Sequence, residues 1–118
     1  MVLKELGQRL RASVDELERT RLSGRFEGLG LTKLADVVPR QPVRVGGEVS
    51  RVIIAPRRGV PNLEVRISDG TGSITAAFTG RRSIIGIEHG RALIVEGVAV
   101  PERDGNVIFN PAYTLIAY

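Results

Sequence analysis

Two short runs of alternating apolar and polar residues, joined by an Asp-Gly turn, constrain this chain more than any other feature. The runs are NLEVRIS (62–68) and SITAAF (73–78), and DGTG (69–72) lies between them. Alternation with a period of two predicts strands that bury one face, and glycine accepts the positive φ that a tight turn requires. The side chains expected to face inward are Leu63, Val65, Ile67, Ile74, Ala76 and Phe78; those expected to face outward are Glu64, Arg66, Ser73, Thr75 and Ala77.

Three further runs extend the β pattern. VRVGGEVSRVII (43–54) predicts a long strand with a bulge or sharp bend at its glycine pair. RALIVEGVAV (91–100) predicts a fourth strand, and VIFNPAYTLIAY (107–118) a fifth that is interrupted at Asn110-Pro111. The segment 80–90 breaks the pattern and predicts a short helix or helical turn between the third and fourth strands.

Five short strands with a helical element between the third and fourth have the order of an OB-fold barrel. An open antiparallel sandwich is the main alternative, but it would not need that helical plug. The fold class we expect is therefore mainly β: a five-stranded OB-fold barrel with an N-terminal α-helix and a short helix between strands 3 and 4.

The residues before the barrel predict two smaller elements. Residues 2–22 have apolar residues at spacings of three and four, which predicts a helix that ends near Ser23-Gly24. This helix either packs on its own domain or mediates oligomerisation or partner docking. Thr32 is expected to cap a short helix from Lys33 to Val38, which Pro39 ends. The expected organisation is a helix over 1–24, a connector over 25–42 and the barrel over 43–118.

The sequence lacks the residues that several classes of function require. The chain has no cysteine, so disulfides, thiol nucleophiles and cysteine-ligated metals are excluded. DGTG lacks the Lys-Ser or Lys-Thr of a P-loop and precedes a strand rather than a helix. His89 is the only histidine, which leaves no zinc ligand set. We expect no enzyme activity, no metal and no cofactor, in a cytoplasmic protein without a membrane span or secretory signal.

The charge of the chain points instead to a polyanion. The net charge is +4, and all but two of the 17 basic residues are arginines. Guanidinium groups bind phosphates bidentately and keep their charge. In OB barrels the usual binding surface comprises the face of strands 2 and 3 and the loops between strands 1–2 and 4–5. The candidate nucleic-acid-binding residues are Arg44, Arg51, Arg57, Arg58, Arg66, Arg81, Arg82 and Arg103.

Aromatic residues make up only 4% of the chain. Single-strand binders stack bases on exposed rings, and the outward positions expected on strands 2 and 3 offer none. Phe78 shares the parity of Ile74 and is expected in the core, whereas Phe109 or Tyr113 could be exposed. We therefore expect electrostatic, weakly sequence-specific and salt-dependent binding, with structured DNA as one suitable ligand.

Three segments resemble the wedge domain of RecG-type branch-migrating DNA helicases. LGLTKLADVVPR (29–40) resembles its helical lead-in, SDGTGSITAAF its strand-turn-strand core and IFNPAY its last strand. The chain is also similar to the small stand-alone OB-fold nucleic-acid-binding proteins of actinobacteria. The resemblance covers residues 29–118, and no ATPase domain accompanies it. It implies a nucleic-acid-binding module without a motor, with DNA favoured over RNA.

One alternative belongs to a different class of function. The helix over 2–22 could pair with itself or with a protein partner, with the barrel as a passive scaffold. The sequence thus predicts either a nucleic-acid-binding barrel or a protein-interaction module that uses its N-terminal helix.

Overall fold

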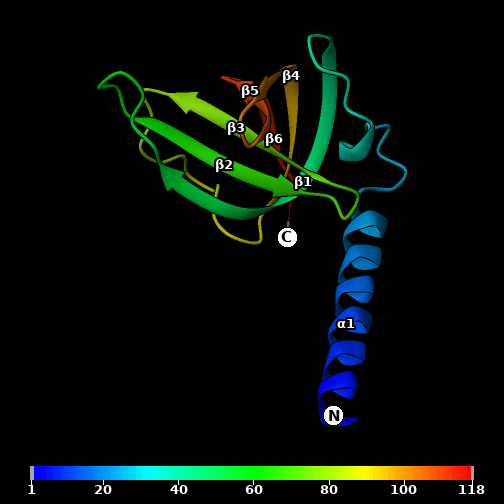
Figure 1. Cartoon of the computed structure of the whole chain (residues 1–118). Coiled ribbons are helices and arrows are strands. Elements are labelled where there is room, and N and C mark those ends of the chain that lie inside the picture. The colour runs from blue at the N-terminus through cyan, green and yellow to red at the C-terminus, as the bar shows by residue number, and fades with distance from the viewer. Residues whose placement is uncertain (1, 118) are drawn as a thin grey trace.

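The computed structural model describes residues 2–117, which form one β-barrel and a long helix that projects from it (Figure 1). The elements are α1 (Val2–Phe26), the 3₁₀ turn η1 (Leu34–Asp36), β1 (Pro42–Ile54), β2 (Asn62–Ser68), β3 (Ser73–Thr79), β4 (Ala92–Glu102), β5 (Gly105–Phe109) and β6 (Ala112–Leu115). None of the helices within residues 2–117 is long and apolar enough to span a membrane.

The strands close into a barrel because β1 and β4 are long enough to pair with successive partners along their length. The first half of β1 pairs with β4 and its second half with β2, both antiparallel. β3 pairs with β2 on one side and, in parallel, with β5 on the other. β5 returns to β4 and completes the ring. This closed five-stranded connectivity confirms the expected OB-fold barrel.

β1 bends where it changes partners, as its glycine pair suggested. Glu48 pairs with both Ser68 of β2 and Ala92 of β4. Just before it, a Cβ on Gly47 would lie 2.8 Å from the backbone nitrogen of Ser68, so only glycine fits there. The register shift lies at Ser50, between Val49 and Arg51, rather than at the glycines themselves.

The core confirms the inward-facing residues predicted for β2 and β3, but Ala77, which was expected to face outward, is also buried. The six side chains expected to face inward are all buried. They join a cluster completed by residues of η1, β1, β4, β5 and the loop after β3, including Leu34, Val45, Val49, Leu93, Val95 and Ile108. Burial of each large aliphatic side chain contributes about 1.5–3 kcal/mol, so this cluster is the main stabilising feature of the barrel.

The prediction of a short helix between strands 3 and 4 is wrong. The segment between β3 and β4 contains turns, such as the one in which the Ile87 N–H donates to the Ile84 carbonyl over 3.1 Å. Gly86 and Gly90 have φ values of 89° and 86°, which no right-handed helix accommodates. The turns still bury Ile84 and Ile87 against the core.

The connector also differs from its prediction. The expected helix from Lys33 to Val38 shortens to the single 3₁₀ turn η1, with Lys33 rather than Thr32 at the N-cap position. The Thr32 N–H donates instead to the carbonyl of Arg44. Extended backbone at Val37 then ends the turn.

The predicted fifth strand divides into two strands with different partners. Asn110 has a φ of 49°, and together with Pro111 it separates β5 from β6. β5 closes the barrel between β3 and β4, whereas β6 pairs only with β4. The chain therefore keeps β4 as a partner across Asn110-Pro111 but loses its pairing with β3.

The N-terminal helix passes through the Ser23-Gly24 stop that we expected. It continues to Phe26 because Leu22 and Phe26 are both buried where the helix meets the barrel. Gly28, with a φ of 79°, lies just beyond its last turn.

Candidate functional site

A groove of about 240 Å³ runs across the outer face of β1, β2 and β3. Its lining side chains are Arg51, Ile53, Glu64, Arg66, Thr75 and Asp104. Strand register explains why they meet: Arg51 lies opposite Arg66, which lies opposite Thr75. A second row on the same face runs from Ile53 through Glu64 and Ala77 to Phe109 of β5. The barrel thus places residues from four strands on one surface.

Two tight turns border this face. In the loop 55–61, Arg57 and Val60 exchange backbone hydrogen bonds, both of 2.9 Å, around a two-residue turn at Arg58-Gly59. Both turn residues have positive φ, and a non-glycine residue such as Arg58 seldom adopts that conformation. The second turn, at Arg103-Asp104, joins β4 to β5. Because both turns are closed by strand pairing, their arginines are presented by ordered backbone.

Arg57 joins the two turns that border this face. Its guanidinium lies 4.9 Å from the centre of the Phe109 ring and forms a 3.0 Å ion pair with Glu102. Stacking of a cation on an aromatic face contributes about 0.5–1 kcal/mol at exposed sites. The loop 55–61 is thereby held beside the hairpin of β4 and β5.

The electrostatic feature of the groove is its central pair of like charges. Arg51 and Arg66 are cross-strand neighbours, an arrangement that is destabilising for like charges. Among residues 2–117, neither has a carboxylate within ion-pair distance. Arg66 donates only to the hydroxyl of Ser73, over 2.8 Å. An anion bound between the two guanidinium groups would relieve their repulsion.

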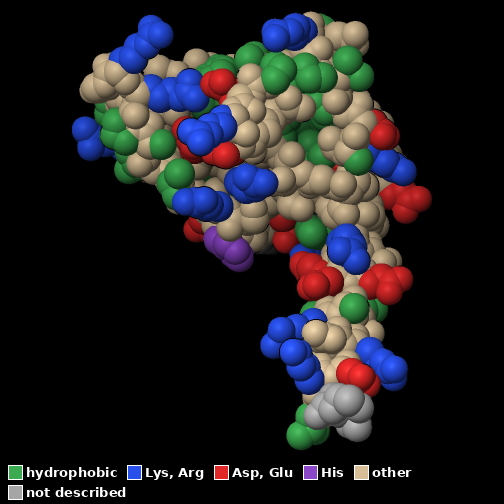
Figure 2. All heavy atoms as spheres, in the orientation of Figure 1, with side chains coloured by type: hydrophobic (Ala, Val, Ile, Leu, Met, Phe, Trp, Pro, Cys, Tyr) green, Lys and Arg blue, Asp and Glu red, His purple; other side chains and the backbone are tan. Residues whose placement is uncertain are grey.

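Carboxylates moderate the positive charge of this surface. Glu64 and Asp104 line the groove, and Glu102 holds Arg57. Figure 2 shows Lys and Arg side chains gathered toward the end of the barrel that carries the loop 55–61, with acidic side chains among them. The positive charge of this surface is therefore partly offset by neighbouring carboxylates.

The structure places two of the eight predicted arginines in the groove and three in the turns that border this face. Arg51 and Arg66 lie in the groove, and the two turns carry the other three, which are Arg57, Arg58 and Arg103. Arg44 lies on the other half of β1, in a 2.9 Å ion pair with Glu96. Arg81 and Arg82 are exposed on the loop after β3, outside the groove lining.

Sequence reasoning missed the role of Phe109. Its position on the outer face follows from the parallel pairing of β5 with β3, which no local pattern reveals. Phe78 is buried in the core, as predicted, and Tyr113 contacts its ring edge-on at 5.7 Å. Among residues 2–117, Phe109 is therefore the aromatic residue in the two rows of side chains that cross the outer face of β1, β2 and β3.

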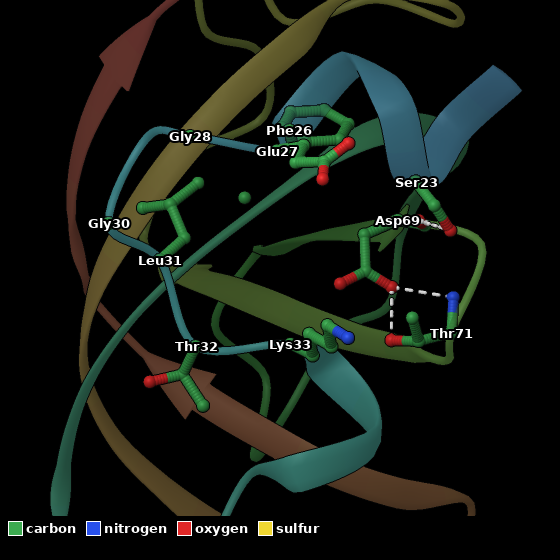
Figure 3. A pocket seen from close by; sticks show the side chains of 11 residues that line it. Ser23, Phe26, Glu27, Gly28, Gly30, Leu31, Thr32, Lys33, Asp69 and Thr71 are labelled. Carbon is green, nitrogen blue, oxygen red and sulfur yellow. Dashed lines mark hydrogen bonds between the residues drawn. The ribbon is translucent and has the colours of Figure 1, made fainter. Parts of the chain in front are cut away.

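The DGTG turn contributes to a second pocket, of about 310 Å³, where α1 and the connector meet the barrel (Figure 3). Oδ1 of the buried Asp69 accepts hydrogen bonds from the Thr71 hydroxyl and from the N–H groups of Thr71 and Gly72. Its Oδ2 accepts from the N–H of Leu34. The amides that could cradle a phosphate are thus occupied, which confirms the turn.

Ion pairs reinforce this joint between helix and barrel. Arg21 and Arg25 of α1 both bind the carboxylate of Glu48 on β1, and Arg21 also binds Glu18. The hydrogen bond from Arg21, opposed by partial burial and assisted by Arg25, holds the pKa of Glu48 below its usual range. Within residues 2–117, no group of His, Asp and Glu side chains is arranged to hold a metal ion.

Comparison with known proteins supports the fold. The chain matches no protein family model, and no curated protein matches it. RecG bound to a three-way DNA junction matches 71% of this chain with a TM-score of 0.61 and 20% identity, although the match spans only 12% of that chain. The second OB-fold domain of replication protein A from Methanococcus maripaludis matches 74% of this chain and 95% of its own, at a TM-score of 0.60 and 17% identity.

A third neighbour binds a different kind of ligand. The OBody AM3L09, bound to hen egg-white lysozyme, matches 72% of this chain and 92% of its own, with a TM-score of 0.57 and 14% identity. These structures show that the barrel is an OB-fold. At such identities they do not determine its ligand.

Proposed function

We propose that the barrel is a non-catalytic nucleic-acid-binding module of the cytoplasm that prefers DNA and contacts phosphates through arginines. The observation that carries this proposal is the unpaired Arg51–Arg66 couple at the centre of the groove. Two adjacent guanidinium groups without carboxylate partners cost stability in the free protein. A phosphodiester backbone supplies the missing negative charge at both positions.

The surrounding surface suits a strand that crosses the barrel. Arg57 and Arg58 border one end of the face and Arg103 lies in the other turn, so further phosphates would find partners along the strand. The position agrees with the strand 2–3 face and the flanking loops that OB-folds use for oligonucleotides. RecG bound to a DNA junction and a domain of replication protein A are among the structures with a similar barrel, which adds support for DNA.

The small aromatic content determines the mode of binding. Each stacked base contributes about 1–3 kcal/mol in single-strand binders. Among residues 2–117, the aromatic residue of this face is Phe109, whose ring is already covered by Arg57. Phosphate contacts must therefore supply most of the affinity, with little discrimination between sequences. Such binding tolerates forks and junctions as readily as single strands.

Equilibrium titration of fluorescently labelled oligonucleotides tests the proposal. The panel comprises single-stranded DNA, duplex, a fork and an RNA hairpin, in 50 mM salt. The double variant R51Q/R66Q should weaken binding about 100-fold or more, because it removes two charge-assisted contacts of about 1.5–3 kcal/mol each. The matched control is R44Q, which removes an arginine from the same strand outside the groove and should change affinity less than twofold.

Two results would contradict the proposal. One is the absence of binding to any nucleic acid of the panel by the wild-type chain at low salt. The other is an equal effect of R44Q and R51Q/R66Q, which would move the site away from the groove. Tighter binding to the RNA hairpin than to every DNA would reverse the preference for DNA.

A further inference from the structure

The helix α1 carries an apolar stripe that its own barrel does not cover. Five side chains at spacings of three, four, four and three residues are 50% to 83% exposed: Leu3, Leu6, Leu10, Val14 and Leu17. They lie on the part of α1 that extends away from the barrel (Figure 1). Contiguous exposed apolar surface of this kind marks an interaction site.

The joint at the base of α1 keeps this stripe away from the barrel. Leu22 and Phe26 are buried there, and two arginines of the last turns bind Glu48. The Ser23 hydroxyl also donates to the carbonyl of Asp69. Because the last two turns are fixed by packing and ion pairs, the remaining turns cannot fold back. The stripe is therefore available to another molecule.

The apolar positions of the stripe are arranged symmetrically about Leu10. Reversal of the helix about Leu10 superposes Leu3 on Leu17 and Leu6 on Val14. Two antiparallel copies that cross at Leu10 would thus match apolar side chains at every level. The offset of eleven residues from Leu3 to Val14 favours nearly straight helices over a heptad supercoil, which agrees with Ser13 interrupting the heptad seam.

The charges of α1 also distinguish between the two orientations. Residues 2–13 carry three basic residues and one acidic residue, whereas residues 15–18 carry three acidic residues and are followed by Arg19, Arg21 and Arg25. Figure 2 shows mainly basic side chains toward the free end, with acidic atoms among them, and acidic side chains nearer the barrel, with basic atoms beside them. A parallel pair would place like charges together. An antiparallel pair places Lys4 of one copy near Glu18 of the other.

Gly7 supplies an independent indication. A glycine within a helix costs about 1 kcal/mol relative to alanine, and a Cβ at this position would meet no atom within 4 Å. The monomer thus gives no reason for it. Gly7 and Ser13 border the stripe and exchange places in the same reversal about Leu10. Small residues at these two positions would let a second helix approach closely.

We propose that two copies of this chain associate through α1 as an antiparallel pair centred on Leu10. The rise of 1.5 Å per residue places the two Leu22 residues about 36 Å apart, so the barrels lie at opposite ends of the pair. This association does not depend on the nucleic-acid site, because the groove is on the barrel and the stripe is on the helix.

Sedimentation equilibrium of the full chain tests the association. The wild-type chain should sediment as a dimer at micromolar concentration. L10E should raise the dimer dissociation constant by about 100-fold or more, because it buries charges at the crossing point. The control I85E places the same charge on another exposed apolar residue, in a barrel loop, and should leave the dimer unchanged. Circular dichroism should show unchanged secondary structure in both variants.

Disulfide trapping tests the orientation, since the chain has no cysteine of its own. A mixture of L3C and L17C should form a disulfide between the two variants under mild oxidation, and L3C alone should form none. Efficient crosslinking of L3C to itself would contradict the antiparallel arrangement. A monomeric wild-type chain would overturn the proposal outright, and so would a stripe that binds lipid vesicles but not a second copy.

Discussion

Substitution of Gly70 by alanine tests how the helix is held on the barrel. Gly70 lies in the DGTG turn with a φ of 88°. A Cβ there would overlap the carbonyl oxygen of Arg19 in α1 and lie 2.9 Å from the Ser23 hydroxyl oxygen. The turn therefore needs glycine twice, once for its backbone conformation and once for the close approach of the helix.

Gly59 provides a matched control for the magnitude. It has a φ of 78°, but a Cβ there would meet no atom within 4 Å. G59A should therefore lose only the backbone strain, about 1–2 kcal/mol. G70A should lose the same strain plus an overpacking cost of about 1–3 kcal/mol. The expected difference between the variants, about 1–3 kcal/mol, measures the contact between the turn and α1.

Urea denaturation of both variants gives this difference, and hydrogen exchange shows where it arises. Amides in the last two turns of α1 should exchange faster in G70A than in G59A, because the helix must move to admit the new methyl group. Equal losses of unfolding free energy, with equal exchange rates in α1, would refute this account of the joint.

Other substitutions test the same joint through its charges and its hydrogen bonds. Because Arg21 and Arg25 lower the pKa of Glu48, the stabilisation that the Glu48 ion pairs give to the fold is fully present above the ordinary glutamate pKa near 4.5 and is lost as the pH falls through the lower pKa of the folded state. Urea titrations of E48Q should show a flatter stability profile between neutral and acidic pH than those of the wild type. Parallel profiles would contradict the ion-pair cluster. Asp69 accepts four hydrogen bonds while buried, so D69A should lose about 2–4 kcal/mol of unfolding free energy in the same assay. The control D104A, at an exposed position, should change the unfolding free energy by less than about 0.5 kcal/mol and should strengthen oligonucleotide binding. An equal loss in both variants would argue against the hydrogen-bond network of Asp69.

The strands of the barrel could be predicted because their signal is local. Leu63, Val65 and Ile67 alternate with polar residues, and every one of them is buried in the structure. The turn at DGTG could also be predicted from the sequence, because Asp69 needs only the next three residues to form its hydrogen bonds with Thr71 and Gly72.

The errors arose where distant contacts override local preference. Ser23-Gly24 has the composition of a helix stop, yet the barrel buries Leu22 and Phe26 on either side and the helix continues. Between β3 and β4, glycines with positive φ replaced an expected helix by turns that still bury two isoleucines.

The groove was only partly accessible from sequence for the same reason. Parity placed Arg66 on the outer face, but its pairing with Arg51 depends on the bulge at Ser50, which sets the register of β1. Phe109 reaches this face only when β5 pairs with β3. Arg44 could not be separated from Arg51 by sequence, since both are arginines of one strand whose halves have different partners.

The salt dependence of oligonucleotide binding measures how many phosphates the arginines of this face contact. If all five arginines of the face contact phosphates of single-stranded DNA, log K should fall with log salt at a slope of about −3.5, since each contact contributes about −0.7. R51Q/R66Q should reduce the slope to about −2.1, whereas R44Q should leave it unchanged. A wild-type slope near zero, or the same slope in wild type and R51Q/R66Q, would contradict phosphate recognition by this groove.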